Sequence, residues 1–109
     1  MKYIRTKDGI YECIWEITEI NGKNYINVRY DGILYREEIL KQADTIEELC
    51  DGYIVESKNN PAKWFEMTCE EYGRRKPKFN NWIIYAYIKT DKGLIYVAKM
   101  NDTGELELL

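Results

Sequence analysis

Short β-favouring segments alternate with turn dipeptides over the first forty residues. The segments cover residues 10–20, residues 23–30 and residues 33 to about 39, and apolar and polar side chains alternate along the first two. Such alternation is typical of strands in a sheet that has one exposed face. The dipeptides between and before the segments favour the positive φ angles of tight turns; they are Asp8-Gly9, Asn21-Gly22 and Asp31-Gly32. The pattern predicts an antiparallel meander.

Two segments in the middle of the chain carry helix signals. Asp44 is followed three residues later by Glu47, and Gly52 closes that segment, which predicts a short helix capped at both ends. Asn60-Pro61 predicts the start of a second helix, because Asn caps helices and Pro is tolerated at the first helical position. Aromatic and other side chains then recur at helical spacing until Gly73, and we interpret them as core residues. They are Trp64, Phe65, Thr68, Cys69 and Tyr72.

The last third of the chain returns to strand patterns. Residues 81–90 are apolar on both faces, which predicts a central strand. A turn at 91–93 leads into a strand over 94–100, and a short strand over 105–108 follows. Together these elements predict an α+β domain over residues 1–109, with a mostly antiparallel sheet and two short helices. An N-terminal meander and C-terminal hairpins of this kind can curl towards a small barrel.

The composition excludes several kinds of catalytic and metal site. The chain has 109 residues, 45% of them apolar, and no histidine. A Ser-His-Asp triad, a Cys-His pair and a His-ligated zinc site are therefore excluded. Ser57 is the only serine and lies in no nucleophile-elbow motif. We expect no enzyme activity, no metal and no cofactor.

The three cysteines are Cys13, Cys50 and Cys69, an odd number without Cys-x-x-Cys spacing. We expect reduced thiols buried in the core of a cytoplasmic protein. No apolar stretch has the length of a signal peptide or of a membrane span, so a membrane partner is not expected.

Charge is strongly segregated along the chain. Residues 31–71 carry eleven acidic and four basic side chains, whereas residues 74–100 carry seven basic and one acidic. The acidic side chains either solvate short helices or form a negative surface for a basic protein, such as one whose channel holds nucleic acid. Tyrosines on a strand's polar face add contact area. The candidate partner-binding residues are Glu47, Glu48, Asp51, Glu70, Glu71 and Tyr25.

The densest basic segment offers a second candidate site. It follows a predicted helix end, where cations complement the helix dipole. Beside aromatic residues, the same cations could instead bind nucleic acid, a nucleotide or another phosphate. The net charge of −3 disfavours a general nucleic-acid binder. The candidate residues are Arg74, Arg75, Lys76, Lys78 and Trp82.

Three stretches carry a resemblance to a known group. They are Ile4-Arg5-Thr6-Lys7-Asp8-Gly9-Ile10-Tyr11, Ala43-Asp44-Thr45-Ile46-Glu47-Glu48-Leu49-Cys50-Asp51 and Tyr96-Val97-Ala98-Lys99-Met100-Asn101-Asp102-Thr103-Gly104-Glu105-Leu106-Glu107-Leu108-Leu109. These stretches resemble small uncharacterised proteins encoded by phages and prophages of Firmicutes. The resemblance implies expression from a mobile element in a bacterial cytoplasm, and it transfers no site residues.

The implied expression from a mobile element, the segregated charge and the aromatic content together favour a non-enzymatic phage protein that binds and inhibits a host protein. An antiviral nuclease is the target considered, a role similar to that of anti-CRISPR proteins. The alternative is a nucleic-acid or nucleotide-binding module that uses residues 74–78. Oligomeric state stays open, because the strand that begins at Ile33 and the final strand are both candidate sheet edges, and an unpaired edge can pair with a second copy.

Overall fold

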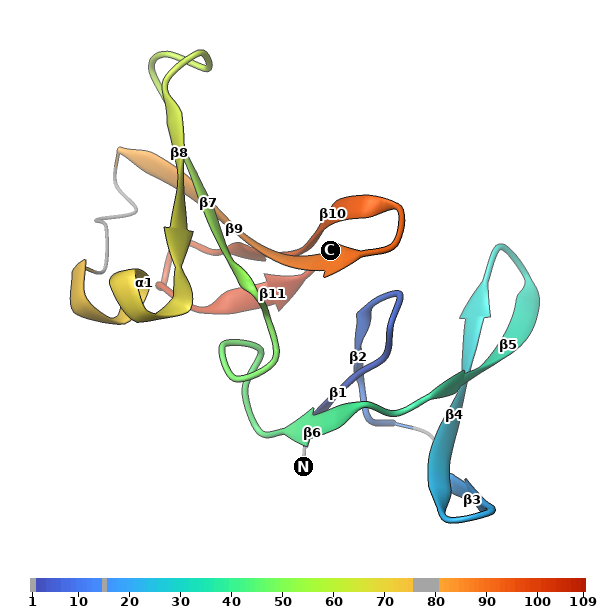
Figure 1. Ribbon diagram of the computed structural model, residues 1–109. Helices are drawn as coiled ribbons and strands as arrows, with labels where there is room; N and C mark the ends of the chain where they lie inside the picture. Colours follow the sequence, from blue (N-terminus) through green and yellow to red (C-terminus); the bar gives the residue numbers. More distant parts are fainter. Residues whose placement is uncertain (1, 15, 76–80) are drawn as a thin grey trace.

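The strands assemble into three antiparallel sheets in the computed structural model of the protein, which describes residues 2–14, 16–75 and 81–109 (Figure 1). The bridging sheet has the order β2-β1-β6 and consists of β1 (Tyr3–Arg5), β2 (Ile10–Glu12) and β6 (Lys41–Ala43). The hairpin sheet has the order β3-β4-β5 and consists of β3 (Thr18–Ile20), β4 (Lys23–Tyr30) and β5 (Ile33–Glu38).

The large sheet has five strands in the order β11-β10-β9-β7-β8. Its members are β7 (Gly52–Ser57), β8 (Trp64–Thr68), β9 (Trp82–Thr90), β10 (Gly93–Met100) and β11 (Leu106–Leu108). One helix, α1 (Cys69–Arg75), follows β8. The described chain is therefore mostly antiparallel sheet with one short helix. No helix in this part of the chain is long and apolar enough to cross a membrane.

The two predicted hairpins of the hairpin sheet are confirmed by their turn geometry. Asn21 and Asp31 both have φ angles of 51°, and each is followed by a glycine with positive φ. This is the backbone of two-residue type I′ turns, whose twist matches that of the flanking strands. Accordingly Ile20 pairs with Lys23, and Tyr30 pairs with Ile33.

The main core lies around β9, which has two strands on either side and is the central strand that the sequence predicts. Ile84, Ala86, Tyr87 and Ile88 on β9 are all buried, so both faces of the strand are covered. Residues of β7, β8 and β10 complete the core together with Leu49 of the preceding turn. The larger of the two buried clusters therefore belongs to this sheet.

A second, small core attaches the hairpin sheet to the bridging sheet. It consists of Ile4 on β1 with Ile26 and Val28 on β4. The Glu37 carboxylate on β5 reinforces it, because it accepts hydrogen bonds from Thr6 Oγ1 at 2.6 Å and from the Tyr11 hydroxyl at 3.4 Å. Burial, together with the charge of Glu37, raises the pKa of Tyr11 to about 12. Tyr11 therefore stays protonated and remains a hydrogen-bond donor at neutral pH.

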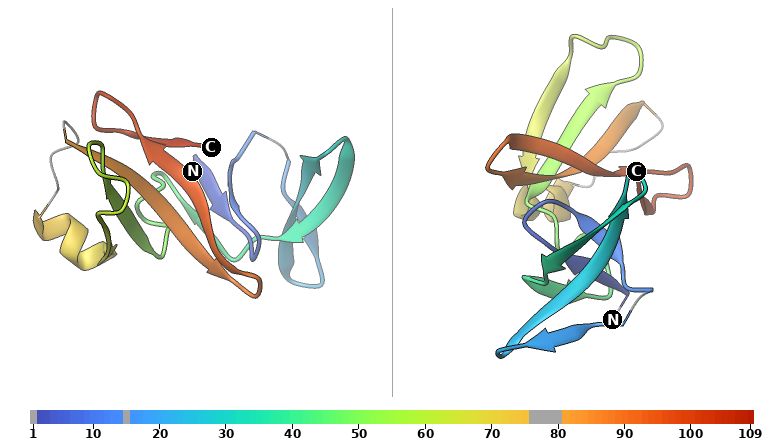
Figure 2. Two further views of the ribbon diagram at one scale, coloured as in Figure 1. Left: turned by 90° about the horizontal axis from the view of Figure 1, so that it is seen from above. Right: turned by 90° about the vertical axis from the view of Figure 1, so that its right-hand side faces the viewer.

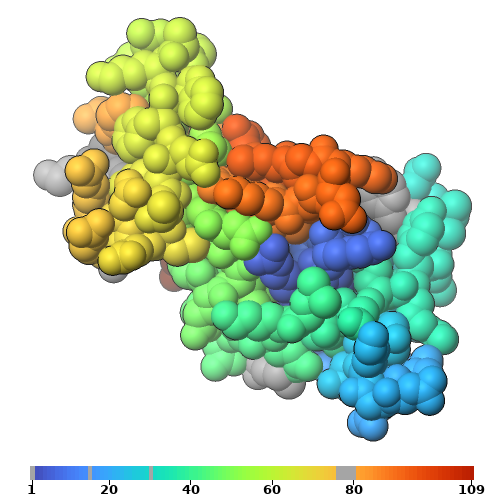
Figure 3. Space-filling model, in the orientation of Figure 1, coloured from blue at the N-terminus to red at the C-terminus, as the bar shows by residue number. Residues whose placement is uncertain are grey.

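The molecule is elongated as a result. Its extents are 48 × 27 × 24 Å and its radius of gyration is 15.2 Å, against roughly 13 Å for a compact domain of about this length. Viewed from above, the hairpin sheet stands apart from the large sheet (Figure 2). The space-filling view shows the same projection at the lower right (Figure 3).

Both predicted helices need correction. The segment from Asp44 to Asp51 is a turn that leads into β7, and in it the amides of Leu49 and Cys50 both donate to the Ile46 carbonyl. The chain then leaves the helical path because the Asp51 amide donates to the Tyr87 carbonyl on β9 at 2.8 Å. A tertiary contact thus overrides the local capping signal.

The second predicted helix is divided between a strand and α1. Trp64 to Thr68 pair with β7 instead of forming helical turns, and helix begins only at Cys69. Thr68 caps the helix by accepting a hydrogen bond from the Glu71 amide at 3.0 Å. Gly73 does not end the helix, which runs to Arg75. Aromatic and β-branched residues favour strands when a partner strand is present, and β7 provides it.

Three further expectations are also corrected. The strand predicted over residues 10–20 is interrupted between β2 and β3. The sheets do not close into a barrel within the described residues. Cys13 is half-buried and Cys50 is buried, whereas Cys69 is exposed, so the expectation of a buried thiol is wrong for Cys69.

Candidate functional site

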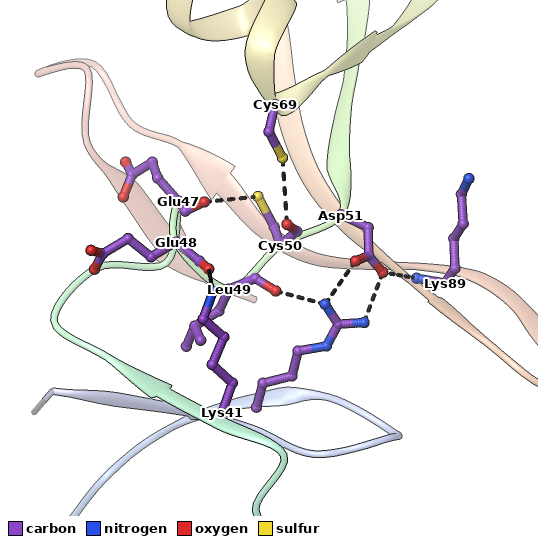
Figure 4. A network of polar contacts seen from close by, with 9 residues as sticks. Lys41, Glu47, Glu48, Leu49, Cys50, Asp51, Cys69 and Lys89 are labelled. Atoms are coloured by element: carbon purple, nitrogen blue, oxygen red, sulfur yellow. Dashed lines mark hydrogen bonds and ion pairs between the residues drawn. The ribbon is translucent and has the colours of Figure 1, made fainter.

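Four of the predicted acidic residues lie on neighbouring segments. Glu47 and Glu48 are exposed on the turn before β7, and Glu70 and Glu71 lie in the first turn of α1. The Cys69 thiol donates a hydrogen bond to the Cys50 carbonyl at 3.4 Å, which joins the two segments (Figure 4). We call these four glutamates the acidic surface. Glu48 is partly engaged, because its carboxylate accepts hydrogen bonds from the Thr45 amide and hydroxyl.

Asp51 is separate from the acidic surface, because its carboxylate is occupied within the fold. The Arg5 guanidinium donates to both carboxylate oxygens, at 2.7 and 2.8 Å, and also to the Leu49 carbonyl at 2.8 Å (Figure 4). The Lys89 amide donates to the same carboxylate at 2.7 Å. The side chains of Arg5 and Asp51 are only 21% and 28% exposed. Asp51 therefore connects β1 of the bridging sheet to β9 of the large sheet.

Asp51→Asn is expected to lower the free energy of unfolding by about 2 kcal/mol at pH 7, the usual size of hydrogen bonds to a charged group. Burial opposes ionisation of Asp51, but the hydrogen bonds from Arg5 and the Lys89 amide outweigh it and lower the pKa of the carboxyl. The carboxylate thus stabilises the fold above its unfolded-state pKa of about 3.9, and this stability is lost as the pH falls through the lower folded-state pKa.

Urea denaturation at neutral and at acidic pH tests this prediction. The difference between the wild type and Asp51→Asn should be full at pH 7 and should shrink once the pH falls below about 4. A difference that is independent of pH would contradict the role of the ionised carboxylate.

Tyr25, the remaining residue of the predicted partner-binding set, lies on the hairpin sheet. It is half-buried on β4, where it pairs with Glu38 of β5 and Thr18 of β3. The hairpin sheet and α1 are at opposite ends of the molecule (Figure 1). The structure therefore does not bring Tyr25 together with the acidic surface.

The predicted basic site is only partly described. Arg74 and Arg75 are exposed in the last turn of α1, and neither forms an ion pair with another described residue. Lys76 and Lys78 lie outside the described residues. Trp82 is half-buried at the start of β9, with Phe65 edge-on at 5.4 Å and the Lys63 ammonium 5.7 Å from the ring centroid. The ring of Trp82 therefore already packs against β8 and the loop before it.

A different surface, the apolar groove, lies where the three sheets meet. Its volume is about 340 Å³. The bridging sheet, β4 and the C-terminal residues of the large sheet contribute its walls, which are Ile10, Tyr11, Glu12, Ile14, Ile26, Val28, Arg29, Leu108 and Leu109. Ile14 is 70% exposed and Leu109 is 71% exposed, although both are large apolar side chains.

Strand register explains why one wall of the groove is apolar. Residues two apart on β4 share a face, so Ile26 and Val28 both point towards β1 and β2. Tyr35 on β5 lies directly opposite Val28 and thus shares this face, as does Ile33 two pairs further along. Both side chains are exposed, so the apolar face continues beyond the groove to the tip of the hairpin.

Sequence reasoning missed the groove because no single segment contains it. Ile14 falls within the strand predicted over residues 10–20, whereas it lies in the break between β2 and β3. The segment Ile33-Leu34-Tyr35 did carry a usable signal. Three consecutive apolar residues beside a tight turn expose apolar area on at least one face of the strand, and such patches mark interaction sites.

The two described depressions differ in chemistry. The second has a volume of about 420 Å³ and is lined by Lys41, Gln42, Ala43, Asp44 and Glu48. The Lys41 ammonium within it donates to the Glu48 carbonyl at 3.1 Å. Among the described residues, no group of three or more cysteine, aspartate or glutamate side chains could hold a metal ion.

Comparison with protein-family models, with curated proteins and with solved structures finds no match to this chain.

Proposed function

We propose that the chain is a non-enzymatic protein-binding module that holds an apolar segment of another protein in the apolar groove. The observation that supports this proposal is the exposure of large apolar side chains, Ile14 and Leu109 above all, around one groove. Apolar patches rimmed by polar residues are typical of interaction sites in proteins. Glu12 and Arg29 form part of such a rim here and can orient a partner segment by hydrogen bonding.

Burial of the exposed groove residues supplies the driving force. Complete burial of one large aliphatic side chain contributes roughly 1.5 to 3 kcal/mol. The groove residues Ile26 and Val28 are already packed against Ile4, so this wall requires little additional ordering on binding. A short apolar segment of the partner is the ligand that fits these properties.

The proposed partner is a bacterial host protein, which the protein would inhibit. This class of partner follows from the resemblance to phage and prophage proteins, and an antiviral nuclease is the specific candidate. The acidic surface gives further support, since Glu47, Glu70 and Glu71 can face the lysines and arginines that line a nucleic-acid channel. In this arrangement the groove provides affinity and the acidic surface provides electrostatic steering.

Ile14→Asp is expected to weaken partner capture by roughly 10-fold or more, because it removes about 1.5 to 3 kcal/mol of apolar burial. The measurement is recovery of a host protein on the tagged chain from a nuclease-treated bacterial lysate. Leu94→Asp is the matched control, since Leu94 is 43% exposed on β10 and does not line the groove. It should recover the partner as the wild type does.

Two outcomes would count against the groove. Equal recovery by the wild type and Ile14→Asp would show that the contact lies elsewhere. Recovery that disappears with nuclease, and also with Arg74→Ala combined with Arg75→Ala, would support nucleic-acid binding. The guanidinium groups of these two residues are exposed and form no ion pair with another described residue, and this observation favours the second function.

A further inference from the structure

The outer edge of β5 is free of pairing within the described residues. β5 is the last strand of the hairpin sheet, and its partner β4 is on one side only. Natural edge strands are usually protected by charged side chains, lysine above all, by proline, by a bulge or by a covering element. The charged residues of β5 all lie in its second half, from Arg36 to Glu38, so its first half, from Ile33 to Tyr35, has neither charge nor proline. The pairing of β5 with β4 is regular over all six residues.

The hairpin turn determines which backbone groups face outwards. In a two-residue hairpin, the pair that closes the turn is hydrogen-bonded, and here that pair is Tyr30 and Ile33. Hydrogen-bonded and non-hydrogen-bonded pairs alternate along an antiparallel hairpin. At the other end of this hairpin the Ile39 amide donates to the Asn24 carbonyl at 2.8 Å, so the odd-numbered residues of β5 are the hydrogen-bonded ones there too. Backbone groups of Ile33, Tyr35 and Glu37 therefore point to β4. Those of Leu34, Arg36 and Glu38 point away from β4.

We infer that β5 pairs antiparallel with β5 of a second copy of this chain, with the two-fold axis at Leu34. A two-fold antiparallel pair must place one residue opposite itself. Centring the pair on Arg36 would oppose two guanidinium groups, and centring it on Tyr35 would oppose Ile33 to Glu37. Centring it on Leu34 opposes Leu34 to itself and Ile33 to Tyr35 of the other copy, so that apolar side chains meet at these positions. The exposed Arg36 then lies opposite Gly32 of the turn.

A pair centred on Leu34 also satisfies backbone groups that point away from β4. The amide and carbonyl of Leu34 point outwards, so the two Leu34 residues can exchange two hydrogen bonds across the axis. Leu34 is 61% exposed, and pairing covers it together with Ile33 and Tyr35 of both copies. The resulting sheet has six strands, and the apolar faces of the two hairpins become continuous across the axis. The inference does not depend on the proposed function, since neither Leu34 nor the edge lines the groove.

The mass in solution, measured by sedimentation over a range of concentrations, tests the dimer. The wild type should move from monomer to dimer as concentration rises, and the dimer should be weak because the shared edge is short. Leu34→Pro should weaken the dimer at least tenfold. Its lost amide points outwards, and proline is tolerated on an edge strand when the amide faces solvent. Leu94→Lys is the control and should dimerise like the wild type. Leu94→Pro would not serve, because it would disturb the hairpin of β9 and β10.

Cysteine cross-linking tests the register. In a hydrogen-bonded antiparallel pair the Cα atoms are about 5.5 Å apart, a distance that a disulfide can span. Oxidation of Leu34→Cys by glutathione disulfide should therefore give a covalent dimer, with two thiols oxidised and two glutathione molecules released. Leu94→Cys, tested in the same way, should give only the background of the native thiols of the wild type.

A monomer at every concentration would overturn the inference. So would a dimer whose dissociation constant is unchanged by Leu34→Pro, or equal cross-linking of Leu34→Cys and Leu94→Cys. Ile14→Asp separates this inference from the proposed function, because it should leave the dimer intact while it weakens capture of the host protein.

Discussion

Tyr53→Ala is expected to lower the free energy of unfolding by about 4 kcal/mol, the range found when a buried aromatic side chain is truncated. Tyr53 lies on β7 and is 1% exposed. Its ring stacks on that of Tyr72 in α1, with 3.8 Å between the centroids. Truncation would leave a cavity in the main core and would also remove the contact that holds α1 against β7.

Urea denaturation followed by circular dichroism measures this loss. Tyr53→Phe keeps the ring and should retain most of the stability. Leu40→Ala truncates a side chain that is 57% exposed and should change the free energy of unfolding by no more than about 0.5 kcal/mol. A cost for Tyr53→Ala as small as that of Leu40→Ala would show that the stacked pair is not part of a packed core.

Gly52→Ala is expected to cost about 2 to 3 kcal/mol through overpacking in the middle of the large sheet. A Cβ atom at this position would lie 2.5 Å from the Tyr87 hydroxyl oxygen and 2.7 Å from the ring carbon that carries it. Tyr87 pairs with Gly52 across the two strands and is buried, and its hydroxyl donates to the Glu66 carboxylate. The ring has little room to move aside.

Gly73→Ala is the matched control for this variant. No atom of the described residues outside its own helix lies within 4 Å of a Cβ built on Gly73, and alanine favours helix over glycine by about 1 kcal/mol. Gly73→Ala should therefore leave the free energy of unfolding unchanged or raise it. If both variants were equally stable, the close approach of Tyr87 to the backbone would not limit the residue at position 52.

The elements that could be predicted from the sequence are those encoded locally. Asn21-Gly22 and Asp31-Gly32 specify their turns through positive φ, and alternation along β4 places Ile26 and Val28 inside. The long apolar run of β9 likewise indicated a central strand, since few other positions in a sheet cover both faces.

The elements that could not be predicted depend on contacts between distant segments. The signal for a helix after Asp44 is genuine, but it is overridden by hydrogen bonds from Asp51 to β9 and from Arg5 to Asp51, a residue 46 positions away. Asp51 is predicted as a partner-binding residue from the charge pattern alone, because the sequence does not show that Arg5 binds its carboxylate. The apolar groove was missed for the same reason, since it exists only where three sheets meet.

The small core of Ile4, Ile26 and Val28 has a consequence for how the native state fluctuates. Few buried side chains and the hydrogen bonds to Glu37 hold the hairpin sheet, whereas the much larger core around β9 holds the large sheet. Partial opening can therefore release the hairpin sheet while the large sheet stays folded. Backbone amides of β4 should exchange with solvent deuterium through this opening, and those of β9 only through global unfolding. A partner seated in the groove would have to suppress the opening, so slower exchange along β4 would report its binding directly.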